Sequence, residues 1–105
     1  MIKAVDLSKN DILYKYSNPI LAQNKAFHYL GRNAVLYKSL NKYKKYSIID
    51  PNGKIINFGQ IGYEDFTKHH DLKRRHNYLV RTTNMRGDWK NNLFSPNNLS
   101  RNILW

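Results

Sequence analysis

The sequence predicts a small α+β protein, and three observations indicate this class. Two runs of β-forming residues flank a turn-forming stretch, a capping residue followed by proline occurs twice where a helix could begin, and apolar residues recur at helical spacing. We expect a small antiparallel β-meander over about residues 34–58, packed with two or three short helices over about residues 19–30, 72–84 and 96–104. A chain of 105 residues has room for one ordinary core, so residues 1–105 are expected to form a single domain.

The first predicted helix covers residues 19–30. Asn18 is a favourable N-cap, and Pro19 suits the first helical position because no backbone N–H is needed there. Gly31 stands where a C-terminal cap with positive φ is common. The face expected to be buried comprises Ile20, Ala26 and Phe27. Nothing else in residues 1–28 carries a recognisable pattern, so the structure of this N-terminal segment is predicted from the cap alone.

Three strands are predicted after this helix. Residues 34–40 have the pattern of a strand with Val35 and Tyr37 on one side. Residues 43–49 and 54–58 are rich in β-branched and aromatic residues and predict two further strands. The short connections favour an antiparallel meander.

The turn between the last two strands is the clearest local signal. Between Asp50 and Gly53, Pro51 presets φ for a tight turn and Gly53 supplies a left-handed position. Gly59 and Gly62 interrupt the strand pattern and are expected to start an irregular loop. We therefore interpret these three glycines as structural positions that need a special backbone geometry.

A second helix is predicted over residues 72–84, with Asp71 as its N-cap. Successive residues of a helix are rotated by about 100°, which assigns the side chains to two faces. The face expected to be buried carries Leu72, His76, Leu79, Val80 and Thr83. The opposite, exposed face carries Arg74, Tyr78 and Arg81.

A Ser-Pro pair again predicts a helix start, here for residues 96–104. Leu99 and Ile103 lie four residues apart, on the side expected to be buried. Trp105 follows Ile and Leu, which indicates a tail docked on the sheet rather than a frayed end. Trp89 and Trp105 are both interpreted as structural core residues.

The composition limits the classes of function. Lysine and arginine number 18 against 7 aspartates and glutamates, and the resulting formal net charge of +11 favours an anionic partner. The chain has no cysteine, which excludes a disulfide scaffold, a cysteine-based zinc finger and a cysteine nucleophile. No apolar run approaches the roughly 20 residues of a membrane span. No signal peptide is recognised, so we expect a soluble, intracellular protein.

A basic and aromatic stretch over residues 68–81 is the main candidate site. A tyrosine ring between two guanidinium groups can stack on a base while the arginines hold phosphates, or the cations can pair with acidic side chains of a protein. The alternative is a solvated helix face whose tyrosine packs on the loop over residues 59–70. The predicted contacts with nucleic acid or another anionic partner are made by Lys68, Lys73, Arg74, Arg75, Tyr78 and Arg81.

Histidines occur near this stretch at His69, His70 and His76. Neutral imidazole is a good zinc ligand, but adjacent side chains diverge, His76 is expected to face the core, and no further ligand completes a site. We therefore expect no metal ion and no cofactor. A metal-dependent nuclease is a third alternative for the function, because a hairpin followed by a helix is similar to the ββα-metal nucleases. Against it, the hairpin carries Asp50 and no histidine.

Over about residues 29–105 the chain resembles a small family of short, basic proteins encoded by giant, nucleocytoplasmic large double-stranded DNA viruses. An abundance of Lys, Asn, Ile and Tyr, which A+T-rich codons encode, agrees with this resemblance. The residues that carry it are Tyr29-Leu30-Gly31, Lys45-Tyr46, Asp50-Pro51-Asn52-Gly53-Lys54, Phe58-Gly59-Gln60, Gly62-Tyr63-Glu64-Asp65-Phe66-Thr67-Lys68-His69, Asp71, Lys73-Arg74-Arg75, Asn77-Tyr78-Leu79, Arg81, Trp89, Ser95-Pro96-Asn97-Asn98-Leu99-Ser100 and Ile103-Leu104-Trp105.

The resemblance implies a protein without catalytic activity. We expect a non-enzymatic structural protein of a giant-virus particle, a minor capsid protein that contacts acidic capsid partners or packaged viral DNA. It would assemble with other virion proteins and be located in the virion, and in the host cytoplasm during assembly. The alternative is a DNA- or RNA-binding protein that acts in the infected cell. The salt dependence of binding distinguishes the two, because phosphate contacts weaken steeply with salt.

Overall fold

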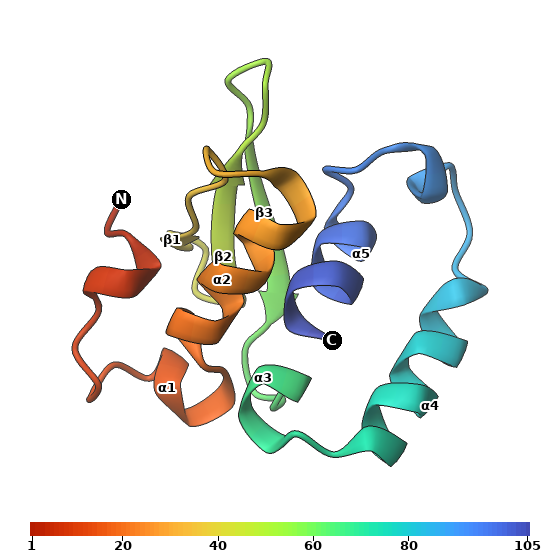
Figure 1. Ribbon diagram of the computed structural model, residues 1–105, viewed down its shortest axis with the longest axis horizontal. Coiled ribbons are helices and arrows are strands. Elements are labelled where there is room, and N and C mark those ends of the chain that lie inside the picture. Colours follow the sequence, from red (N-terminus) through yellow and green to blue (C-terminus); the bar gives the residue numbers. More distant parts are fainter.

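The computed structural model describes residues 1–105 and contains five α-helices and a three-stranded antiparallel sheet, which confirms the predicted α+β class. In Figure 1, α2 crosses in front of the sheet, α5 lies beside it, and α4 stands at the outer edge of the molecule. None of the helices is both long and apolar enough to span a bilayer. In chain order the elements are η1 (Ala4–Asp6), α1 (Leu13–Tyr16), α2 (Pro19–Leu30), β1 (Tyr37–Lys38), β2 (Lys44–Ile49), β3 (Ile55–Gln60), α3 (Phe66–His69), α4 (Leu72–Thr83), η2 (Trp89–Asn91), α5 (Pro96–Leu99) and η3 (Ser100–Leu104).

The sheet is the predicted meander, with strand order β1-β2-β3 and both neighbouring pairs antiparallel. Its hairpin turn confirms the sequence prediction. Gly53 has φ 80°, and the Asp50 carboxylate accepts the backbone N–H groups of Asn52 and Lys54, each at 2.9 Å. The turn therefore carries its own hydrogen bonds, as an Asx-type turn does.

The first strand is much shorter than the predicted residues 34–40, because it comprises only Tyr37 and Lys38; the fully buried Leu36 lies just before it. The buried Gln23 side chain of α2 donates to the Ala34 carbonyl at 2.6 Å and accepts from the Leu36 N–H at 2.8 Å. The Gln23 amide thus takes the backbone hydrogen bonds of Ala34 and Leu36 that a neighbouring strand would otherwise make. Strand pairing therefore begins only at Tyr37.

The N-terminal segment adds to the sheet edge and to the core. The Ala4 N–H donates to the Leu36 carbonyl at 2.9 Å, and the Lys38 N–H donates to the Ile2 carbonyl at 2.8 Å. Ala4 and Leu13 are both fully buried. Residues 1–28 therefore share the core with the segment that follows.

Helix α2 begins and ends where the sequence predicts, and the Asn18 side chain accepts from the Leu21 N–H at 3.2 Å. Of the predicted face, Ala26 is fully buried, but Ile20 and Phe27 are exposed. The buried positions follow helical spacing but use a proline, small residues and one amide, which lets the helix approach the C-terminal segment closely. They are Pro19, Ala22, Gln23 and Ala26.

The C-terminal segment completes the core. The predicted helix over residues 96–104 is two pieces, α5 and the π-helical turn η3, and the Ser95 side chain caps the first by accepting the Asn98 N–H at 3.2 Å. Leu99 and Ile103 are fully buried, as predicted. Trp89 is not a core residue, because it lies half-buried on η2, where its Nε1–H donates to the Met85 carbonyl.

Gly59 does not end the third strand, as the sequence suggested, because β3 continues to Gln60. The predicted irregular loop is therefore shorter and includes α3. Gly59 has φ 78°, and a Cβ there would lie 2.8 Å from Leu104 Cδ1 and 3.1 Å from Lys45 Cβ. The glycine lets the strand pass directly under the C-terminal segment.

We predict that Gly59→Ala destabilises the protein more than Gly53→Ala does. Both residues have a similar positive φ, whereas the space around Gly53 is open. The backbone term costs either variant about 1–2 kcal/mol, and overpacking adds about 1–3 kcal/mol at Gly59 only. Urea unfolding of both variants measures the difference, and equal losses would show that Leu104 moves aside at no cost.

Candidate functional site

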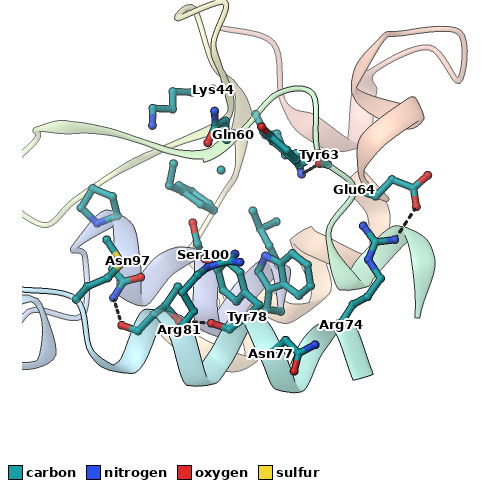
Figure 2. A pocket seen from close by; sticks show the side chains of 18 residues that line it. Lys44, Gln60, Tyr63, Glu64, Arg74, Asn77, Tyr78, Arg81, Asn97 and Ser100 are labelled. Atoms are coloured by element: carbon teal, nitrogen blue, oxygen red, sulfur yellow. Dashed lines mark hydrogen bonds and ion pairs between the residues drawn. The ribbon is translucent and has the colours of Figure 1, made fainter. Parts of the chain in front are cut away.

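A cleft of about 720 Å³ lies between α4 and the end of the sheet. Figure 2 shows Lys44, Gln60 and Tyr63 on the sheet side and Arg74, Asn77 and Arg81 on the side of α4. The floor between these two walls is formed by Phe58, Gly59, Tyr78, Ser100, Leu104 and Trp105. The cleft combines cations, amides and aromatic rings in one concave surface and is our candidate site.

Helix α4 begins as predicted, and the Asp71 carboxylate accepts the N–H groups of Lys73 and Arg74 at 3.0 and 3.1 Å. These two hydrogen bonds, the one from Arg74 foremost, hold the pKa of Asp71 below its ordinary value. The helix is rotated relative to the prediction. Leu72 is 72% exposed, and His76 and Val80 are also exposed. Its apolar periodicity therefore does not mark a core face.

Aromatic and polar contacts with the C-terminal segment hold α4 in place instead. The Tyr78 ring stacks on Trp105 with a centroid distance of 4.2 Å and an angle of 10°. The Arg101 guanidinium donates to the Leu79 carbonyl at 2.7 Å and to the Thr82 hydroxyl at 2.6 Å. Trp105 is thus docked, as expected for the tail, but it docks on α4 rather than on the sheet.

The predicted stripe of Arg74, Tyr78 and Arg81 does come together, and it faces the cleft. The Arg81 guanidinium lies 5.6 Å from the centroid of the Tyr78 ring. Arg74 lies 3.9 Å from the Glu64 carboxylate, and both side chains are about half exposed. Burial raises the pKa of the Tyr78 phenol above its ordinary value. The two arginines are therefore available to a ligand, whereas Tyr78 is largely engaged by Trp105.

The other predicted site residues lie elsewhere. Lys68 on α3 and Lys73 on α4 are exposed and do not line the cleft. Arg75 is used internally, because its Nε donates to the Trp105 main-chain oxygen at 2.7 Å and its guanidinium lies 5.6 Å from the Phe66 ring centroid. Three of the six predicted residues therefore share one site.

The histidines have separate environments. His69 Nδ1 accepts the Asp71 N–H at 2.9 Å, and its ring lies 5.1 Å from that of Trp105. Burial, with the nearby Arg74 charge, lowers the pKa of His69. His76 is exposed on α4 and does not face the core. No group of three or more His, Cys, Asp or Glu side chains comes together.

Sequence reasoning missed the residues of the cleft that do not belong to the basic stretch. Lys44, Gln60 and Tyr63 come from the end of the sheet, and Asn77 comes from α4. The Gln60 and Asn77 amides make no hydrogen bond with the residues drawn in Figure 2. Tyr63 is 66% exposed. A sheet end and the helix after it are natural neighbours, but only the tertiary structure places these side chains across a cleft.

A buried ion pair behind the cleft fixes its sheet-side wall. The Lys45 and Asp65 side chains are 3% and 0% exposed, with Nζ and Oδ2 3.1 Å apart. Lys45 Nζ also donates to the Tyr63 carbonyl at 2.6 Å and, at 3.4 Å, to that of Tyr16. Burial lowers the pKa of Lys45, and the Asp65 carboxylate opposes this effect.

The second oxygen of Asp65 continues the network. It accepts the N–H and the hydroxyl of Thr67, and the Thr67 hydroxyl lies 3.1 Å from Ser17 Oγ. Ser17 Oγ in turn lies 2.7 Å from the Tyr46 hydroxyl. The polar groups are satisfied internally, which is the condition for burying them. The network is therefore structural, and it holds Tyr63 at the rim.

Residues 34–82 are similar to a family of unknown function, DUF5754. The matched segment contains the sheet, α3 and α4 up to Thr82, and so both walls of the cleft. No curated protein and no solved structure matches the chain.

We predict that Lys45→Met costs about 3–5 kcal/mol of stability, because it leaves the Asp65 carboxylate buried without a counter-charge. Lys38→Met is the matched control. Lys38 pairs with Asp11 at 2.7 Å, but its side chain is 37% exposed, so we expect a loss of about 1 kcal/mol or less.

Chemical denaturation of both variants measures the two losses. The double variant Lys45→Met/Asp65→Asn should recover part of the stability lost by Lys45→Met, because the charge left behind is removed. A Lys45→Met variant as stable as Lys38→Met would contradict the structural role of the buried pair.

Proposed function

We propose that the protein is a non-enzymatic nucleic-acid-binding protein whose cleft holds the phosphates of a strand. The observation that carries the proposal is the charge of the cleft. Three of its lining cations, Lys44, Arg74 and Arg81, are exposed, against the single carboxylate of Glu64. The chain as a whole has a net charge of +11, which attracts a polyanion at longer range.

The spacing of the cations suits a strand rather than a single anion. Arg74 and Arg81 are seven residues apart on α4, which corresponds to about 10 Å along the helix. Both line the cleft from the side of α4, and Lys44 lines it from the sheet side (Figure 2). Cations at this separation contact different phosphates of one backbone, and guanidinium groups can hold each phosphate with two hydrogen bonds.

Nucleic acid fits the lining better than an acidic protein surface does. The cleft contains tyrosine and tryptophan rings and side-chain amides beside its cations. Rings and amides stack on bases and pair with their edges, whereas carboxylates of a protein partner need cations only. The resemblance to giant-virus proteins adds a location to the proposal: a virus particle, where the strand is the packaged genome. A minor capsid protein that binds acidic partners is the second candidate, supported by the same charges.

We predict that the double variant Arg74→Glu/Arg81→Glu binds an oligonucleotide at least about tenfold more weakly than the wild type, because both phosphate contacts become repulsive. The slope of log affinity against log salt should become shallower by about 1.4, which corresponds to two lost single-strand phosphate contacts. Fluorescence anisotropy at several salt concentrations measures both quantities.

Lys68→Glu/Lys73→Glu is the matched control, because it makes the same change in charge outside the cleft. It should weaken binding much less. Equal losses in the two double variants would show that net charge alone drives binding and would reject the cleft. Wild-type binding to purified capsid protein, with none to DNA or RNA, would favour the capsid candidate instead. Mass spectrometry of purified particles tests the location.

A further inference from the structure

We infer that the cleft binds an unpaired strand and that the Tyr63 ring is the surface on which one of its bases stacks. This inference rests on the proposed function. It adds the class of nucleic acid and the residue on which a base stacks. Phosphate contacts alone do not distinguish a single strand from a duplex, whereas base contacts do.

Tyr63 is the aromatic residue of the cleft whose ring is free. Phe58 is fully buried, and Tyr78 and Trp105 stack on each other. Tyr63 is 66% exposed and lies at the rim (Figure 2). A large aromatic side chain left open to solvent beside three cations is typical of a single-strand binding groove.

The main chain that carries this exposed ring is anchored at one point. The Tyr63 carbonyl accepts a hydrogen bond from the buried Lys45 ammonium at 2.6 Å. Gly62, which precedes it, has φ 102°, and Glu64, which follows it, lies 3.9 Å from Arg74. The buried ammonium therefore orders the main chain that carries the ring, which lowers the conformational entropy lost when a base stacks on it.

The space around the ring suits one nucleotide. The volume of about 720 Å³ lies within the range of small-molecule sites. Gln60 and Asn77 bring amide groups from opposite walls, and an amide can both donate to and accept from the edge of a base. A duplex keeps the faces of its bases stacked on one another inside the helix, so no base face is free to stack on the Tyr63 ring. An unpaired base can enter.

The experiment measures binding of the full chain to three labelled ligands of equal length: oligothymidylate, the same strand without bases, and a duplex. The wild type should bind oligothymidylate at least about fivefold more tightly than the abasic strand, the lower range for one stacked base. Tyr63→Ala should bind oligothymidylate no more tightly than the abasic strand. Its affinity for the abasic strand should equal that of the wild type. Tyr63→Phe should keep the preference for oligothymidylate, because the ring is retained.

Tyr43→Ala is the matched control. Tyr43 is also a tyrosine with 66% exposure near the end of the sheet, but it does not line the cleft, so its loss should leave binding unchanged. A wild type that binds all three ligands equally, or an unchanged Tyr63→Ala, would overturn the inference. The proposed function would still stand if the Arg74→Glu/Arg81→Glu variant lost affinity.

Two further outcomes are distinct from these. If the wild type binds none of the three ligands, the proposed function fails, and the inference fails with it. Thymidine 5′-monophosphate that binds more tightly than the strand would assign the cleft to a free nucleotide and overturn the inference. Weak competition by the mononucleotide, with strong binding of the strand, supports it.

Discussion

The ion pair between Lys45 and Asp65 is the interaction on which the rest of the structure depends. It is buried almost completely, and it brings together β2, the segment before α3, and the junction of α1 and α2. A buried ion pair adds little to stability compared with apolar side chains of similar volume. A fold that buries one of the two charges without its partner is strongly destabilised. We therefore expect the pair to act chiefly on specificity, by favouring the arrangement in which the lysine, the Asp65 carboxylate and the Tyr63 carbonyl satisfy one another.

The cleft exists because α4 is held at a distance from the sheet. Its contacts with the body are a ring stack and hydrogen bonds, and its aliphatic side chains at Leu72 and Val80 are exposed. A helix packed by an aliphatic face would close the gap, because side chains of facing elements interdigitate at a short interaxial distance. The Trp105 ring instead lies between α4 and the core, and it contacts both. The arginines can face an open space for this reason.

The sequence was most informative where the cause of a structure is local. The turn at Gly53 and the helix start at Asp71 depend on neighbouring residues only, and both were predicted. The buried face of α4 was not, because its stacking partner Trp105 lies far along the chain and its apolar periodicity pointed to the wrong side. For the site, the sequence predicted the arginines and Tyr78 but not the opposite wall. Lys45 and its partner could not be recognised, since a lysine in a strand is ordinarily exposed.

The burial of the C-terminal segment has a consequence for how the protein is made. Leu99, Ile103 and Leu104 are fully buried against elements from the first half of the chain, and the Gly59 strand passes beneath them. These residues are synthesised after the sheet, so the meander emerges with one side uncovered until they follow. During that interval the exposed strands are open to association with other chains. The large positive charge opposes this association, and it protects the nascent chain before any ligand is bound.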